Sequence, residues 1–324
     1  MGAVPRVTVL GSMNMDIAVT VPELPGPGAT VLGATARFTP GGKGANQAVA
    51  AARLGARVRM AGCTGADEFG GRLLAALRAE SVDTSSVRPV EDVPSGLALI
   101  TVDPRGENMI TVATGANGAV GGPEVAAAAT GPGDVLVISA EIPVAAITAA
   151  LARARVTTAT CLLNLAPAPP EAAAIVAAGV DWLVVNEPEA SAVLGRPVAG
   201  REGARSAAAD LARAGARHAV VTAGAEGAAF AGPDGSGAIE GFRVSAVDSV
   251  GAGDTFVGAL AAALGMGTPP GPAVRAACAA AAVAVTRPGT QAAMPRPGDV
   301  TDVTGVIWPP SAEPPSAEPP PADQ

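Results

Sequence analysis

Aromatic side chains are nearly missing from this sequence of 324 residues. It has no tyrosine, two tryptophans and five phenylalanines, so that aromatic residues make up 2% of the chain. The hydrophobic fraction is nevertheless 49%, and Ala, Val, Leu and Ile supply enough apolar area for a large core. A chain that is disordered over most of its length is therefore excluded, and one large α/β domain or two small domains are expected.

Basic residues are also scarce. The chain has 21 Lys and Arg against 29 Asp and Glu, which gives a net charge of −8. Lysine is nearly absent, and Lys43 stands with no other lysine near it. Because a duplex-binding protein needs a basic face, a nucleic-acid partner is not expected. An acidic protein can still bind a phosphorylated metabolite through a local group of backbone N–H donors.

Cysteine, histidine and long apolar runs are few or absent. Cys63, Cys161 and Cys278 are far apart, and His218 is the one histidine. This excludes a zinc site, a disulfide framework and Ser-His-Asp catalysis, and His218 is expected to be structural. Three scattered cysteines suit a reducing compartment, and the sequence shows neither a signal peptide nor an apolar stretch of about 18 residues. A cytoplasmic protein without a membrane partner is expected.

Strand-like and helix-like segments alternate through the middle of the chain, which predicts βαβ units. The predicted fold class is α/β, with a mainly parallel central sheet and helices on both of its faces. Strands are expected at 6–10, 57–61, 135–139, 160–165, 182–185 and 219–222, and antiparallel strands within 228–247. Helices are expected at 44–54, 69–80, 144–154, 171–178, 202–214, 252–265 and 272–286.

Two other segments do not suit a parallel sheet. Residues 17–38 hold two alternating segments around a Pro- and Gly-rich turn, and residues 96–112 resemble a hairpin with the turn Asp-Pro-Arg-Gly. We expect them to form a small β lid, from about 14–40 and 95–113, within a domain of residues 1–308. Residues 309–324 repeat Ser-Ala-Glu-Pro-Pro and predict a disordered tail.

The segment Gly251-Ala252-Gly253-Asp254 opens a predicted helix after the strand-like residues 242–247. One interpretation is a tight turn of glycines with an acidic residue at a helix start. The other is an anion-binding helix terminus with its own base, because a carboxylate there could take a proton from a hydroxyl that attacks a phosphoryl group. The segment alone leaves both open.

The segment Gly41-Gly42-Lys43-Gly44 looks at first like a phosphate-binding P-loop. That motif needs a glycine five residues before the Gly-Lys pair and Ser or Thr after it, and here Arg37 and Gly44 occupy those places. Two interpretations of the segment remain. It is either a flexible loop before a helix or a hinge that brings the backbone and Lys43 to a ligand.

Polar residues also follow predicted strands, where open α/β sheets bind ligands. Asn14 and Asp16 suit either an Asx turn or a grip on vicinal sugar hydroxyls. Asn186 and Glu189 suit either a helix capping box or a hydrated Mg²⁺. Residues 222–227 suit either a plain turn or a loop for nucleotide phosphates.

Taken in order, these segments resemble the ribokinase family of sugar kinases. The segments are residues 11–16 (GSMNMD), 25–33 (PGPGATVLG), 41–48 (GGKGANQA), 186–190 (NEPEA) and 248–256 (DSVGAGDTF). The resemblance runs from about residue 6 to about residue 298. It implies ATP-dependent phosphorylation of ribose at the 5-hydroxyl, with in-line transfer, and a homodimer through the β lid.

The resemblance also assigns roles to individual residues. It makes Asp254 the base and the amides of Gly251, Ala252 and Gly253 the anion hole for the γ-phosphate. The sugar residues it implies are Asn14, Asp16, Gly42, Lys43, Asn46, Glu141 and Asp254. The ATP residues are Asn186, Thr222, Gly224, Glu226, Gly227, Gly253 and Cys278. Asn186 and Glu189 would organise Mg²⁺, and Asp248, Val250, Ala284, Arg287, Gly289 and Ala293 would surround K⁺. Position 278 is cysteine where the family has histidine, and position 293 is alanine where it has a hydroxyl residue.

Two groups of alternatives remain. The same chemistry could act on 2-deoxyribose, fructose or a nucleoside, although a nucleoside usually wants an aromatic stacking surface. A protein of another class, a non-catalytic sugar-binding or regulatory protein on this fold, would be favoured by the loss of Asp254 or of the glycines before it, and these are intact.

Overall fold

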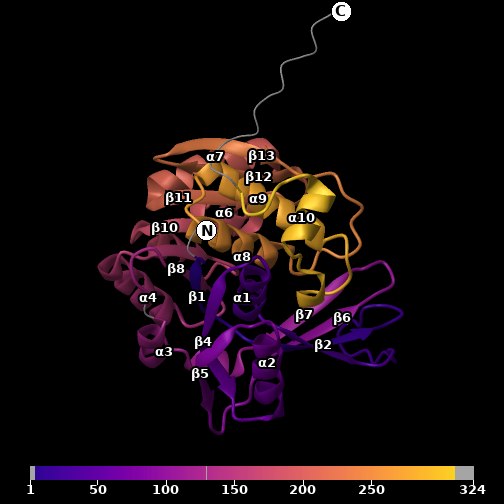
Figure 1. Cartoon of the computed structure of the whole chain (residues 1–324). Coiled ribbons are helices and arrows are strands. Elements are labelled where there is room, and N and C mark those ends of the chain that lie inside the picture. The colour runs from indigo at the N-terminus through magenta and orange to yellow at the C-terminus, as the bar shows by residue number, and fades with distance from the viewer. Residues whose placement is uncertain (1–3, 129, 311–324) are drawn as a thin grey trace, which may run out of the picture.

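Two β-sheets, one of nine strands and one of four, organise the chain in the computed structural model, which describes residues 4–128 and 130–310 (Figure 1). The nine-stranded sheet has the order β13 (Gly235–Glu240), β12 (Gly227–Gly232), β11 (Ala216–Thr222), β10 (Val180–Asn186), β9 (Thr160–Asn164), β8 (Val135–Ser139), β1 (Arg6–Leu10), β4 (Arg57–Gly65), β5 (Asp83–Val90). Seven neighbouring strands run parallel, from β11 to β5, and β12 and β13 are antiparallel. The predicted parallel α/β class is confirmed.

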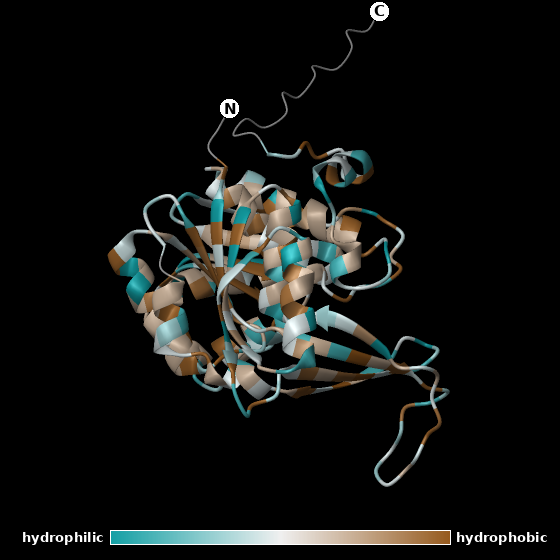
Figure 2. Cartoon of the chain, turned by 60° about the horizontal axis from the view of Figure 1, so that its bottom comes forward, coloured by the Kyte–Doolittle hydropathy of each residue, from teal (hydrophilic) through white to brown (hydrophobic). Residues whose placement is uncertain are grey.

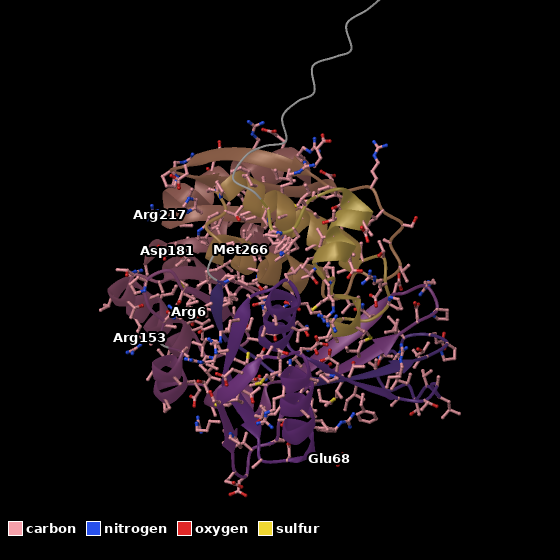
Figure 3. All side chains as sticks on the ribbon, in the orientation of Figure 1. Arg6, Glu68, Arg153, Asp181, Arg217 and Met266 are labelled. Atoms are coloured by element: carbon pink, nitrogen blue, oxygen red, sulfur yellow. The ribbon has the colours of Figure 1, made fainter. Side chains whose placement is uncertain are left out.

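Helices cover both faces of this sheet because successive strand residues alternate between two apolar clusters. Val135 and Val137 of β8 pack into one cluster, and Leu136 and Ile138 pack into the other. The first cluster takes in α1 (Lys43–Arg53), α2 (Glu68–Ala79), α8 (Ala252–Gly265), α9 (Pro270–Ala284) and α10 (Pro297–Thr304). The second takes in α3 (Gly122–Ala127), α4 (Val144–Thr157), α5 (Ala172–Ala177), α6 (Glu187–Leu194) and α7 (Gly200–Ala214). Charged side chains such as Glu68 and Arg153 lie at the periphery (Figure 3).

The four-stranded sheet projects from the side of the main body (Figures 1 and 2). Its order is β3 (Arg37–Gly41), β2 (Asn14–Thr20), β6 (Gly96–Val102), β7 (Asn108–Ala113). β6 and β7 form the expected hairpin. The short 3-10 helix η1 (Gly115–Ala119) leads the chain back to the main body. We call this part the second sheet.

Several local expectations were wrong. Residues 242–247 are not a strand, because the chain leaves the sheet after β13, and residues 30–36 form a loop rather than the second alternating segment of 17–38. The sequence analysis missed β5, a polar edge strand containing Pro89, as well as the short helices α3 and α10. Residues 311–324, most of the expected tail, lie outside the described residues. No helix within 4–128 and 130–310 combines the length and the apolarity needed to cross a membrane.

Candidate active site

The chain enters α8 through a left-handed turn. Gly251 caps this helix with a φ of +81°, a conformation that only glycine adopts without strain. Within the described residues the amides of Gly251 and Gly253 donate to no protein acceptor, while the amide of Ala252 reaches the carbonyl of Ser249 at 3.3 Å. Asp254 lies in the same first turn, 8% exposed. The helix terminus therefore offers N–H donors to an anion beside a buried carboxylate, as one of the two interpretations requires.

Two side-chain amides of α1 hold the Asp254 carboxylate. Asn46 Nδ2 donates to Oδ2 at 2.9 Å, and Gln47 Nε2 donates to Oδ1 at 3.0 Å. Gln47 Nε2 also donates to Asn164 Oδ1 at 2.9 Å, at the end of β9. With one donor on each oxygen, the plane of the carboxylate is fixed by α1 although the residue itself belongs to α8.

Lys43, the only lysine of the chain, begins α1 and faces several carboxylates. Burial alone would lower the pKa of Lys43, but the charges of Asp254, Glu141 and Glu189 outweigh it and raise that pKa. Burial raises the pKa of Asp254, against the opposing effects of Lys43 and of the amides of Asn46 and Gln47. Lys43 is therefore a cation at neutral pH, and Asp254 is a stronger base than an exposed aspartate.

Gly42 allows α1 to begin against residues 11–13, the segment that joins the two sheets and that we call the hinge. Its φ is +87°, and a Cβ at this position would lie 2.6 Å from the backbone nitrogen of Asn14. A Cβ on Gly41 would collide with the carboxylate of Asp16. Gly42 thus allows the backbone at the start of β2 to approach α1, and Gly41 makes room for the Asp16 side chain.

Asn14 and Asp16 stand at the base of the second sheet, on β2. Asn117 of η1 donates to Asn14 Oδ1 at 2.7 Å and also bonds both backbone groups of Met13, at 2.9 and 3.1 Å. Because the oxygen of Asn14 is occupied, its NH₂ group is the part left to meet a ligand. An Asx turn is excluded here, since both residues lie in a paired strand.

Glu141 follows β8 and approaches Asp16. Its Oε2 accepts a hydrogen bond from Ser12 Oγ at 2.6 Å and one from the amide of Lys43 at 3.3 Å. Burial, together with the charges of Glu141 and Asp254, raises the pKa of Asp16 from 3.8 to about 7. An acidic group of this kind can both accept from and donate to the hydroxyls of a polyol.

Asn186 and Glu189 form the predicted capping box of α6. Asn186 Oδ1 accepts from the amide of Glu189, and Glu189 Oε2 accepts from the amide of Asn186, both at 2.9 Å. Both residues also line a small pocket of about 130 Å³, and Lys43 and Asp254 line the same pocket. Each keeps a free position for a further interaction, so that the capping box does not exclude a role toward a cation.

A larger pocket of about 500 Å³ meets the small one at Thr222 and Gly253. Its walls come from the loop after β11, from residues 241–249 and from the apolar face of α9, where Cys278 lies. Burial raises the pKa of the Cys278 thiol to about 12, so that it is a neutral group in this wall. The size of this larger pocket and its apolar wall suit a nucleoside whose phosphates point toward α8.

Glu226, which the resemblance assigned to the ATP site, does not line the larger pocket. Its side chain accepts a hydrogen bond from the amide of Arg201 at 2.7 Å, at the start of α7, whereas Gly224 and Gly227 line that pocket. An acidic side chain at a helix start explains this arrangement.

The predicted potassium residues lie on two neighbouring loops. Asp248 accepts hydrogen bonds from the amides of Val250 and Gly289, both at 3.0 Å, and so joins the loops. Within the described residues the carbonyls of Val250, Arg287, Gly289 and Ala293 accept no hydrogen bond, whereas that of Ala284 accepts the Arg287 amide at 3.3 Å. Oxygen atoms of this kind are suitable ligands for a hard cation.

Sequence reasoning missed the residues that hold the side chains of the site in place through hydrogen bonds. Each of these residues contacts another polar side chain and has no individual pattern in the sequence: Ser12, Gln47, Asn117, Asn164 and Gln291. Gln47 could have been found, because it follows Asn46 within the segment GGKGANQA.

Comparisons with known proteins agree with this arrangement. The model of the pfkB family carbohydrate kinases matches residues 4–297. The chain belongs to the pfkB family of carbohydrate kinases. Ribokinase from Haemophilus influenzae is 36% identical over 290 residues, which cover 89% of this chain and 94% of that protein. Deoxyribokinase from Salmonella typhi is 32% identical over 89% of this chain and 95% of its own length.

Among solved structures, Arabidopsis thaliana ribokinase complexed with ribose and ATP has a TM-score of 0.82 and 28% sequence identity, covering 93% of this chain and 99% of that one. The family match spans both sheets and the whole site, from Asn14 to Asp254. The chain is therefore a sugar kinase.

Proposed function

We propose that this pfkB-family kinase transfers the γ-phosphoryl group of ATP to the 5-hydroxyl of ribose. The observation that carries the proposal is the buried Asp254 carboxylate, held by Asn46 and Gln47 beside the free amides of the α8 terminus. The similarity to ribokinases at 36% identity supports ribose as the sugar and ATP as the donor.

In this mechanism the sugar lies among the polar groups of β2, α1 and Glu141. The NH₂ group of Asn14 and the carboxyl of Asp16 bind its hydroxyls, and Lys43 offsets the negative charge around them. Asp254 accepts the proton of the 5-hydroxyl as that oxygen attacks the γ-phosphorus in line. The amides of Gly251 and Gly253 then bind the oxygens of the transferred group, on which negative charge is concentrated.

Two cations belong to the proposal. Glu189 and Asn186 would hold Mg²⁺ at the phosphates, largely through water, and the ion would neutralise phosphate charge. Asp248 and the free carbonyls of Val250, Arg287, Gly289 and Ala293 would hold K⁺ beside the α8 terminus. No group of three or more His, Cys, Asp or Glu side chains within the described residues is arranged to hold a metal, which fits an Mg²⁺ bound chiefly by phosphates and water.

The second sheet would act as the lid and as the dimer contact. One side of it carries the exposed apolar residues Ile110 and Val112, each about half exposed, whereas Leu99 lies on the other side. A second copy of the chain would cover Ile110 and Val112, and closure would keep water from accepting the phosphoryl group. We also propose that the enzyme works in the cytoplasm, where its three free cysteines stay reduced.

A coupled assay of ADP release tests the proposal, with ribose, 2-deoxyribose, fructose and adenosine as acceptors. Ribose should give the highest kcat/KM, and ³¹P NMR should show the phosphate on the 5-oxygen. Turnover of none of these sugars, with sugar binding intact, would contradict the kinase proposal and favour a regulatory protein.

2-Deoxyribose is the second candidate, because a deoxyribokinase is also similar to this chain at 32% identity. The two sugars differ by one hydroxyl. A site that hydrogen-bonds this hydroxyl rejects the sugar lacking it, so the ratio of the two kcat/KM values decides between them. A higher value for 2-deoxyribose would overturn the choice of ribose.

A further inference from the structure

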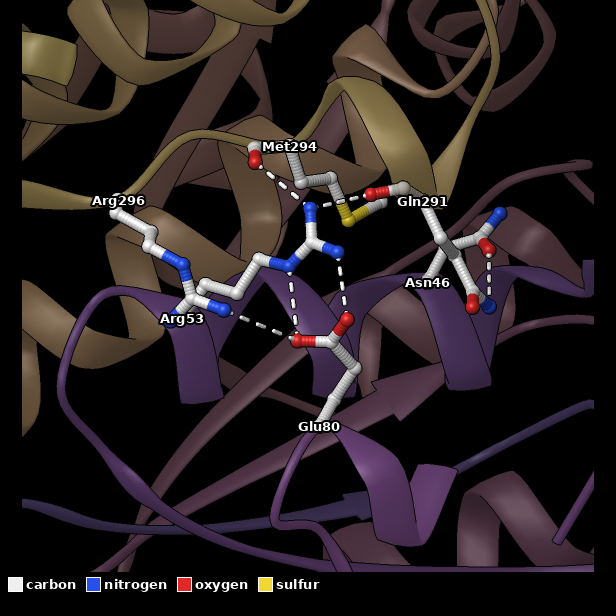
Figure 4. A network of polar contacts seen from close by, with 6 residues as sticks. All are labelled: Asn46, Arg53, Glu80, Gln291, Met294 and Arg296. Atoms are coloured by element: carbon white, nitrogen blue, oxygen red, sulfur yellow. Dashed lines mark hydrogen bonds and ion pairs between the residues drawn. The ribbon is translucent and has the colours of Figure 1, made fainter. Parts of the chain in front are cut away.

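Gln291 lies outside the sugar and nucleotide pockets but is connected to the catalytic carboxylate through one side chain. It begins the 3-10 helix η3 (Gln291–Ala293), and its Nε2 donates to Asn46 Oδ1 at 3.0 Å. Figure 4 shows the two side chains pointing toward one another across the gap between η3 and α1. Asn46 Nδ2 in turn donates to Asp254 Oδ2 at 2.9 Å.

The direction of these two bonds is fixed by chemistry. An ionised carboxylate only accepts hydrogen bonds, so Asn46 must turn its NH₂ group to Asp254. The oxygen of Asn46 then faces away and needs a donor. The NH₂ group of Gln291 meets it, and no other described residue donates to that oxygen. Without Gln291, Asn46 would lose one of the two contacts that distinguish its amide orientations.

The backbone of Gln291 is held independently of its side chain. Arg53 of α1 donates to the carbonyls of Gln291 and Met294 at 2.6 and 2.8 Å. The same guanidinium forms a two-bond ion pair with Glu80, at 2.6 and 3.0 Å, and Arg296 lies 3.7 Å from that carboxylate (Figure 4). A change of the Gln291 side chain therefore leaves η3 attached to α1.

We propose that Gln291 is a positioning residue for catalysis, which orients the Asn46 amide so that it donates to the base Asp254. The proposal rests on the proposed role of Asp254. The segment after α9 would thus affect proton transfer to Asp254 without contacting the sugar or the nucleotide. Gln291 would help keep Asp254 ionised and aligned before the substrate arrives.

Two substitutions separate orientation from packing. Gln291→Met keeps the length of the side chain but removes the donor. Gln291→Glu keeps the shape but at neutral pH can only accept, so that the new carboxylate and Asp254 would compete for the single NH₂ group of Asn46. We expect kcat/KM to fall about 5- to 20-fold for Met and further for Glu, with a smaller change in KM. A packing role would give the opposite order, since Glu is the closer match in shape.

A direct measurement does not depend on turnover. The carboxyl of Asp254 can be titrated by ¹³C NMR in aspartate-labelled protein, with Asp254→Asn for assignment. In Gln291→Met the pKa of Asp254 should rise by about half a unit or more, because a hydrogen bond to the ionised form weakens. The other charged groups around Asp254 are Lys43 on α1, Asp16 on β2, Glu141 after β8 and Glu189 on α6, and these stay unchanged.

A double-mutant cycle with Asn46→Ala completes the test. If Gln291 acts through Asn46, Gln291→Met costs almost nothing in the Asn46→Ala background. Thr304→Val is the matched control, because it removes a hydrogen bond to Val300 on the same C-terminal segment without reaching Asn46. Its pH profile should equal that of the unchanged enzyme. Equal effects of Gln291→Met in both backgrounds, or an unchanged Asp254 pKa, would overturn the proposal, whereas absence of kinase activity in the unchanged protein would instead contradict the proposed function.

Discussion

The two sheets differ in what covers them. Helices bury both faces of the nine-stranded sheet, and its central strands, such as β8, have every residue buried. In the second sheet, by contrast, all six residues of the outer strand β7 are exposed. The candidate site is thereby divided between the two parts: the main body carries Asp254 and the α8 terminus, and the second sheet carries Asn14 and Asp16.

The largest expected effect concerns the main body. Asp254→Asn keeps the shape of the side chain but removes the proton acceptor. It also keeps only one of the two contacts with Asn46 and Gln47, because an NH₂ group cannot accept a hydrogen bond. We expect kcat to fall about 10²- to 10⁴-fold with little change in sugar binding, since the loss of a general base has this size. Stopped-flow or steady-state measurements of ADP release give kcat, and calorimetry with ribose gives the dissociation constant of the sugar. Near-normal turnover would remove Asp254 from the mechanism.

The hinge between the sheets should be the next most sensitive place. Gly42→Ala forces a side chain into a φ of +87° and places its Cβ 2.6 Å from the backbone nitrogen of Asn14. We expect at least about a 10-fold rise in KM for the sugar and a loss of about 2 kcal/mol of stability. Gly55→Ala is the matched control, because its φ is +95° and nothing lies within 4 Å of the added Cβ. It should lower stability through strain alone and leave KM unchanged; an equal KM in both variants would contradict the hinge.

The sequence predicted the main body better than the second sheet. Strands β1 and β8 have the predicted bounds because their apolar runs end at clear turn residues. In the second sheet, residues 30–36 form a loop that was not predicted, and in the main body the edge strand β5 was missed. The conformation of both depends on tertiary contacts rather than on local pattern.

The same distinction applies to the site. Residues that we propose to touch ligands, such as Lys43 and Asp254, stand in motifs that could be recognised. Gln291 and Asn117 are 245 and 103 residues away from the asparagines that they orient. A long-range side-chain contact of this kind leaves no periodicity or spacing in the sequence.

A pH dependence should distinguish the sugar-binding part of the second sheet from the main body. Burial, with Glu141 and Asp254 nearby, raises the pKa of Asp16 to about 7 in the free protein. Sugar hydroxyls that donate to Asp16 favour its ionised form, so affinity should rise as pH increases from 6 to 8, by up to about 10-fold. By the same linkage the free protein should lose stability as pH rises from about 4 through 7, because the folded state holds a proton that the unfolded state releases.

Calorimetric titration with ribose at several pH values, without nucleotide, measures this dependence. Asp16→Asn should bind more weakly and with a flat profile over the same range. A profile that persists in this variant would assign the titration to another carboxyl, and a fall in affinity with rising pH would contradict the sign.

Substitutions on the exposed face of the second sheet should have the smallest effect on the stability of the main body. Ile110 and Val112 are 55% and 49% exposed, and an aspartate at either position would be buried against a second copy of the chain. Ile110→Asp should therefore shift the protein from dimer to monomer in sedimentation, while the stability of the main body changes by less than about 0.5 kcal/mol. Val156→Asp is the matched control, because Val156 on α4 is 83% exposed and lies outside the second sheet. A dimer that survives Ile110→Asp, or one that Val156→Asp disrupts, would place the contact elsewhere, and the second sheet would then have to close over the sugar without support from a partner.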